Sequence, residues 1–81
     1  METNTAPSMA PAVAAEVRAG IARAGVRQKA VAAHLGMSQG ALSRRITGAS
    51  PFTLDELARV AGFLGVPLTA LLPSTDERVA S

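Results

Sequence analysis

The 81-residue sequence contains no cysteine and only one histidine. Without cysteine the chain has neither a disulfide nor a thiolate metal site, and one histidine supplies too few nitrogen ligands for zinc. An activated nucleophile and a cofactor-binding loop are also missing, so we expect no metal, no other cofactor, no small-molecule ligand and no enzymatic activity. A domain of this size buries only about 60% of the surface that its unfolded chain exposes, and packed helices alone must stabilise it.

Long hydrophobic runs are absent as well. No stretch of about 18 apolar residues is available to span a membrane. The opening METNTAPSMAPAVAAEV lacks the basic start and the continuous apolar segment of a signal peptide. We therefore expect a cytoplasmic protein with no membrane partner.

Acidic residues are missing from the whole middle of the chain. None occurs from Val17 to Leu54, and that stretch holds six of the eight basic residues: Arg18, Arg23, Arg27, Lys29, Arg44 and Arg45. The net charge is only +2, so the distribution of charge says more than its total. This distribution predicts a negatively charged partner. The alternative is that the basic side chains form an ordinary solvated surface.

Apolar residues recur at helical spacing, and no segment shows the signal of a strand. The sequence therefore predicts an all-α domain of five helices over residues 10–73, with a disordered tail at 1–9 and a flexible tail at 74–81. The expected helices cover about 11–24, 27–35, 39–47, 53–64 and 67–72. Thr53 and Glu56 have the spacing of a capping box at the start of the fourth helix. That role explains Asp55 and Glu56 better than an acid and base pair would.

The segment from Gln28 to Gly48 contains two short helical patterns joined by a tight turn. Gly36 permits the left-handed backbone that ends the first helix, and Ser38 is suited to cap the second. On a helical wheel, Leu42 and Ile46 fall within about 40° of each other and face the core. The outward-facing set is then Gln39, Gly40, Ala41, Ser43, Arg44 and Thr47.

The order and spacing of these residues resemble those of a known family. The markers occur in this order along the chain: Gln28, Ala32, Gly36, Ser38, Gln39, Ser43 and Gly48. The helix that follows them is capped and ends in LGVP. This pattern resembles the helix-turn-helix domain of the lambda-repressor and Cro type, over about residues 11–73. The resemblance implies a five-helix fold that binds double-stranded DNA. The helix at 39–47 would be the recognition helix in the major groove, and the preceding helix would cross the DNA backbone.

The expected base contacts lie on the recognition helix: Gln39, Gly40, Ala41, Ser43 and Arg44. The forked guanidinium of Arg44 suits O6 and N7 of guanine, and Gln39 can pair with adenine. Gly40 departs from the larger residue often found there and would let the helix sit closer to the bases. Ala41 would touch a thymine methyl, unless it is only a packing choice.

The expected contacts to the DNA backbone are Arg27, Gln28, Lys29, Arg45, Thr47 and Ser50. In the family, the glutamine matching Gln28 reaches a phosphate and braces the glutamine matching Gln39. Arg45 departs from the apolar or aromatic residue common among relatives, so either a phosphate contact or a salt bridge to Asp55 or Glu56 is expected. Plain surface exposure is the alternative for each polar residue.

The resulting hypothesis is a sequence-specific transcriptional regulator of phage or bacterial origin, a small Cro-like repressor. It would be associated with the nucleoid, or located in the host cytoplasm if phage-encoded. We expect a homodimer on a palindromic operator. Leu68 and Leu71 are expected in the core, with the interface as their alternative, and Leu72 and Phe63 are the candidate interface residues. The margin of the core is the alternative for Phe63. His34 is expected to face solvent, with a phosphate contact as the alternative. The alternative function is an antitoxin or adaptor that uses the same fold to bind another protein.

Overall fold

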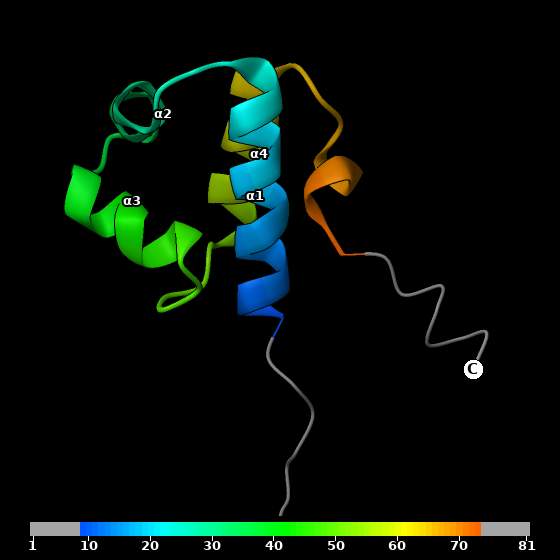
Figure 1. The fold of residues 1–81 in the computed structure, drawn as a ribbon, viewed down its shortest axis with the longest axis horizontal. Coiled ribbons are helices and arrows are strands. Elements are labelled where there is room, and N and C mark those ends of the chain that lie inside the picture. Colours follow the sequence, from blue (N-terminus) through cyan, green and yellow to red (C-terminus); the bar gives the residue numbers. More distant parts are fainter. Residues whose placement is uncertain (1–8, 74–81) are drawn as a thin grey trace, which may run out of the picture.

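The computed structural model describes residues 9–73, which form four α-helices and one short 3-10 helix (Figure 1). The elements are α1 (Ala10–Ala24), α2 (Gln28–Leu35), α3 (Gln39–Ile46), α4 (Leu54–Leu64) and η1 (Leu68–Leu71). No strand occurs between residues 9 and 73, so this part of the chain is all-α, as the sequence predicts. The fifth element is a four-residue 3-10 helix, so residues 9–73 contain four α-helices and not the five that were expected. The expected tail at 74–81, and residues 1–8 of the tail expected at 1–9, lie outside the described residues.

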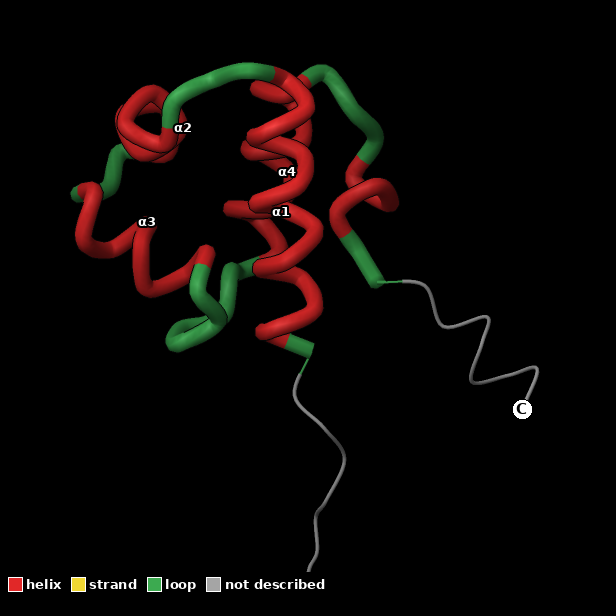
Figure 2. The backbone as a smooth tube through the Cα atoms, in the orientation of Figure 1, coloured by secondary structure: helices red, strands yellow, loops and turns green. Residues whose placement is uncertain are grey.

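Short loops join the helices, and the longest covers residues 47–53 between α3 and α4 (Figure 2). The helix ends agree with the predicted ends to within about one residue because the capping signals are local. Gly36, for example, adopts φ 70° and ends α2, a left-handed conformation that costs other residues about 1–2 kcal/mol. Within residues 9–73, none of the helices combines the length and the hydrophobicity needed to cross a bilayer.

The core is built from the apolar stripes of all four helices and from η1. Its buried residues include Val17, Val31, Leu42, Val60 and Leu71, each at most 1% exposed. The expected placement of Leu71 in the core is confirmed, and Leu68 is half-buried and packs against the core. Leu72 is 38% exposed.

The N-terminus of α4 carries the predicted capping box. The backbone N–H of Glu56 donates to Thr53 Oγ1 at 3.0 Å, and the backbone N–H of Thr53 donates to Glu56 Oε1 at 2.9 Å. Two N–H groups that the first helical turn cannot satisfy thus find partners. The cap fixes the carboxylate of Glu56 at the start of α4.

The C-terminal end of α3 is attached to α1 at two points, near the middle of α1 and at its first turn. The guanidinium of Arg18 donates from Nη1 to the backbone carbonyl of Ile46. Two residues later, Gly48 adopts φ 87°, and a Cβ added there would lie 3.1 Å from Pro11 Cα. Only glycine accommodates both the positive φ and the closeness of the α1 backbone. The loop after α3 therefore sits directly on the first turn of α1.

His34 makes two contacts that join α2 to α4. The exposed ring of His34 stacks on the half-buried ring of Phe63, with centroids 4.7 Å apart and planes 28° apart. Arg59 Nη2 donates to the backbone carbonyl of His34 at 3.2 Å, close to the C-terminus of α2. His34 is thus exposed, as expected, but it also holds α2 against α4.

Candidate nucleic-acid interface

The candidate site is built on α2, the turn at 36–38 and α3. Ser38 has extended backbone angles (φ −72°, ψ 159°), and its hydroxyl accepts from the backbone N–H of Ala41 at 3.0 Å. The predicted cap of α3 is therefore present. Met37 is half-buried and packs against the core, so the turn is anchored between the two helices. This anchoring fixes where α3 begins.

The two faces of α3 differ as the wheel predicts. Leu42 is 1% and Ile46 4% exposed, so both face the core. The residues expected to contact DNA lie on the other faces: Gln39, Gly40, Ser43, Arg44 and Thr47 are exposed, and Ala41 and Arg45 are half-buried. The structure thus brings the expected base contacts onto one accessible helix surface. No acidic residue occurs on α2, on α3 or in the turn between them.

Arg44 and Gly40 occupy the same part of this surface. A Cβ added to Gly40 would lie 3.9 Å from Arg44 Nη1 and 3.9 Å from Ser38 Oγ. The Arg44 side chain therefore runs back over the preceding turn of α3, as long side chains on helices commonly do. Both distances are ordinary van der Waals contacts, so the free protein does not need glycine at this position.

Hydrogen bonds organise the polar residues that follow α3. The Thr47 hydroxyl donates to the Arg44 carbonyl at 3.2 Å, and the backbone N–H of Ser50 donates to the same oxygen at 3.0 Å. Ser50 is half-buried, and Thr47 is exposed. The proton of the Thr47 hydroxyl is thus directed into the protein, and a phosphate would have to compete for it.

The first turn of α2 is a feature that the sequence reasoning did not single out. Arg27 occupies the cap position with an extended backbone and makes no side-chain capping bond, and the first turn carries no acidic residue. Uncapped N–H groups at a helix N-terminus attract anions. Arg27, Gln28 and Lys29 are all exposed around this turn. The lack of Ser, Thr, Asp or Asn at position 27 is the sequence signal that could have revealed it.

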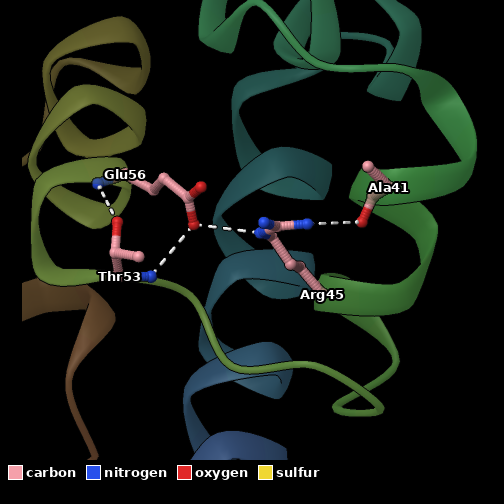
Figure 3. Close-up of polar contacts among 4 residues, drawn as sticks. All are labelled: Ala41, Arg45, Thr53 and Glu56. Atoms are coloured by element: carbon pink, nitrogen blue, oxygen red, sulfur yellow. Dashed lines mark hydrogen bonds and ion pairs between the residues drawn. The ribbon is translucent and has the colours of Figure 1, made fainter.

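Arg45 joins α3 to α4 (Figure 3). Its Nε donates to Glu56 Oε1 at 2.9 Å, and its Nη1 donates to the backbone carbonyl of Ala41 at 3.1 Å. The two side chains are 23% and 17% exposed, respectively. This ion pair is one of the two arrangements that the sequence left open, with Glu56 and not Asp55 as the partner.

The surroundings of Glu56 lower the pKa of its carboxyl group. Partial burial raises this pKa, but the hydrogen bonds from the Thr53 backbone and from Arg45, with the positive charge of Arg45, outweigh that effect. The pKa therefore lies below its ordinary value of 4.5. At neutral pH the carboxylate is charged and paired.

The arrangement of these residues is suited to binding a polyanion. It combines an acid-free helix surface, an uncapped helix N-terminus and several exposed basic side chains. Between residues 9 and 73, no group of three or more metal-ligating side chains lies close enough together to hold an ion.

Comparisons with known proteins identify the fold. A family profile described as helix-turn-helix matches residues 17–71, and no curated protein matches the chain. The solved structure of the clp gene regulator ClgR from C. glutamicum is similar, with 27% identity and a TM-score of 0.75 over 82% of this chain and 86% of that chain. The hypothetical transcription factor NHTF from Neisseria has 20% identity and a TM-score of 0.74 over 99% of this chain and 94% of its own, which is a similarity of fold. The chain therefore belongs to the helix-turn-helix family, as its resemblance to the lambda-repressor and Cro type predicted.

Proposed function

We propose that the protein is a sequence-specific DNA-binding transcriptional regulator that places α3 in the major groove. The observation that carries this proposal is the exposed surface of α3, which bears Gln39, Ser43 and Arg44 and has no acidic residue near it in sequence. Helix-turn-helix proteins read DNA with the N-terminal part of their second helix. The name of the similar solved structure, a gene regulator, supports the same function.

The base-reading residues in this proposal are Gln39 and Arg44, with Ser43 and Ala41 beside them. Arg44 donates two hydrogen bonds to O6 and N7 of a guanine, and Gln39 pairs with N6 and N7 of an adenine. Ala41 contacts a thymine methyl. Gly40 contributes no side chain, and its role is to let α3 approach the bases closely.

The phosphate contacts come from both ends of the motif. At the start of α2, Arg27, Gln28 and Lys29 surround an uncapped helix N-terminus, which favours a phosphate there. At the end of α3, Thr47 and Ser50 supply polar groups. Such contacts fix the position of α3 in the groove and carry no sequence information themselves.

A single motif reads only a few base pairs, so we propose that the protein acts as a homodimer on a palindromic operator. Leu72, which is 38% exposed, and the half-buried Phe63 are the proposed interface residues. The dimer would act as a small repressor in the cytoplasm, associated with the nucleoid. It would bind its operator and thereby exclude RNA polymerase.

Selection of bound sites from random duplex DNA tests the proposal. We expect one half-site, repeated with two-fold symmetry. Arg44→Ala should then weaken binding to the selected site by about 1–3 kcal/mol and relax the preference at one base pair. Arg23→Ala removes the same charge from the exposed last turn of α1, outside the motif, and serves as the matched control.

Two results would argue against this function. If Arg44→Ala and Gln39→Ala together leave binding to the selected site unchanged, α3 is not the recognition helix. If selection enriches no sequence, the protein is not a sequence-specific regulator, and a protein-interaction role as an antitoxin or adaptor gains support.

A further inference from the structure

The two buried residues of α3 lie on a single stripe, so their core contacts oppose rotation of the helix about its own axis less than contacts on several sides would. Its two buried residues, Leu42 and Ile46, lie four positions apart and therefore fall on one stripe of the helix, about 40° apart. An eight-residue helix also depends on tertiary contacts for its stability. The turn at 36–38 and the bond from Arg18 to Ile46 hold the two ends of the helix, and a contact on its flank, away from the buried stripe, adds resistance to rotation.

Arg45 provides that contact. It lies about 80° from the centre of the buried stripe, on the flank that faces α4 (Figure 3). One planar guanidinium bonds the backbone of α3, through the Ala41 carbonyl at 3.1 Å, and the carboxylate of Glu56 on α4 at 2.9 Å. Because the guanidinium is rigid, the two bonds together relate α3 to the start of α4.

Glu56 is itself held in place. The same Oε1 that accepts from Arg45 also accepts from the backbone N–H of Thr53 at 2.9 Å. The carboxylate therefore cannot follow a movement of Arg45 without breaking the capping box of α4. The backbones of α3 and α4 approach each other much less closely than α3 approaches α1 and α2. The side-chain bridge is thus the principal polar link between α3 and α4 among the described residues.

We propose that Glu56 is a positioning residue for DNA reading, which acts through Arg45 to set the rotation of α3 and hence the aim of Arg44. In this role Arg45 is not a phosphate contact. The inference rests on the proposed function, since it concerns how α3 reads bases. A rotation of about 10° moves an atom about 6 Å from the helix axis by about 1 Å. A recognition group must be held to within about 0.5 Å, so such a rotation is enough to spoil a bidentate contact.

Three variants separate the possible roles of this bridge. Arg45→Met keeps an unbranched apolar stem and removes the guanidinium. Glu56→Gln keeps an oxygen that can accept from the Thr53 N–H but removes the charge. The matched control is Thr53→Ala, which weakens the α4 cap and leaves the ion pair intact. Each protein is titrated with the duplex selected by the wild type and with a scrambled duplex, over a series of salt concentrations, at a temperature where circular dichroism shows it to be folded.

We expect Arg45→Met to lower the ratio of selected-site to scrambled-site affinity about tenfold, or about 1.4 kcal/mol, with no change in the salt dependence. Glu56→Gln should lower the ratio in the same direction by a smaller factor, and the double variant should be no worse than Arg45→Met alone. Thr53→Ala should lower the melting temperature and leave the ratio unchanged. A bridge that only stabilised the fold would not produce this pattern.

Two results in DNA binding would overturn the proposal. If Arg45→Met reduces the log-log salt slope by about 0.9 and weakens both duplexes equally, Arg45 is a phosphate contact. If Arg45→Met and Glu56→Gln lower the melting temperature but leave the affinity ratio unchanged, the pair is only a brace for the fold.

A measurement without DNA tests the positioning of α3 separately from the proposed DNA-binding function. Residual dipolar couplings of the α3 amides, referred to those of α4, should report a changed helix orientation in Arg45→Met and none in Thr53→Ala. Unchanged couplings in Arg45→Met overturn the positioning role. If the wild-type protein selects no DNA sequence, the proposed function is wrong. The dipolar couplings still test whether Arg45 sets the orientation of α3, because they need no DNA.

Discussion

Replacement of Gly40 by alanine should make the free protein more stable and its binding to DNA weaker. Glycine in a helix costs conformational entropy, and Gly→Ala at a compatible position stabilises a protein by about 0.4–1 kcal/mol. The position is compatible because the added Cβ would meet only Arg44 Nη1 and Ser38 Oγ, each at 3.9 Å. For a domain of this size the gain corresponds to about 2–8 °C in melting temperature.

The effect on DNA has the opposite sign. Gly40 and Arg44 lie within about 40° of each other on the side of α3 opposite Leu42 and Ile46. A methyl group there extends about 1.5 Å from the backbone into the space that the bases occupy in the proposed complex. Displacement of α3 by about 1 Å disrupts contacts worth about 1–3 kcal/mol each. Affinity for the selected site should therefore fall at least about fivefold.

Gly62→Ala is the matched control, because Gly62 lies in α4, is exposed and has no atom within 4 Å of an added Cβ. It should raise the melting temperature by a similar amount and leave DNA binding unchanged. Thermal unfolding and fluorescence anisotropy with the selected duplex measure the two effects separately. A Gly40→Ala variant that melts at a lower temperature would refute the description of α3. One that binds the selected site as tightly as the wild type would refute the close approach of α3 to the bases.

Three further predictions concern the fold itself. Leu42→Ala should lower the free energy of unfolding by about 2–5 kcal/mol in urea titrations, because Leu42 is only 1% exposed and leaves a cavity. The lowered pKa of Glu56 means that its pairing contributes stability above pH 4.5, and this stability is lost as the pH falls through the folded-state pKa. Glu56→Gln should therefore show a smaller loss of the free energy of unfolding between pH 5 and pH 3, smaller by on the order of tenths of a kcal/mol to 1 kcal/mol, in urea titrations at the two pH values. Gly48→Ala should destabilise more than Gly65→Ala in thermal unfolding, because both glycines have positive φ but only Gly48 faces a backbone atom, Pro11 Cα at 3.1 Å from an added Cβ.

The parts of the fold that the sequence predicts correctly depend on local signals. The capping box of Thr53 and Glu56 spans four residues, and the left-handed glycine at Gly36 ends α2 through its own backbone angle. The buried positions Leu42 and Ile46 follow from helical periodicity alone. Such features need no knowledge of which helices pack together, and for that reason they are visible in one sequence.

The contacts that were not predicted join residues far apart in the chain. Arg18 binds the carbonyl of Ile46, 28 residues away, and His34 stacks on Phe63 of α4. A wheel shows only that Arg18 points away from its own apolar stripe. It cannot show that the end of another helix lies within reach. The choice of Glu56 over Asp55 as the partner of Arg45 likewise depends on how α3 and α4 are placed.

The last segment illustrates a different limit. Pro67 and the leucines after it predict a short helix, and they form η1, a 3-10 helix of four residues. Helix propensity in the sequence does not separate one α-helical turn from one 3-10 turn, because the two differ by a single hydrogen-bond register.

The candidate DNA contacts stay predictions. The exposure of Gln39 and Arg44 shows that both side chains are accessible to a ligand.

The contact between Gly48 and Pro11 has a practical consequence for engineering the protein. It places the beginning of α1 beside the C-terminal end of α3, whereas η1 lies on the opposite side of α1 (Figure 1). An affinity tag or fluorescent label joined just before residue 9 would therefore emerge next to the proposed DNA-binding surface. A fusion joined after residue 73 starts from the far side of the domain. The C-terminal side is the better attachment point for sensors and for surface immobilisation.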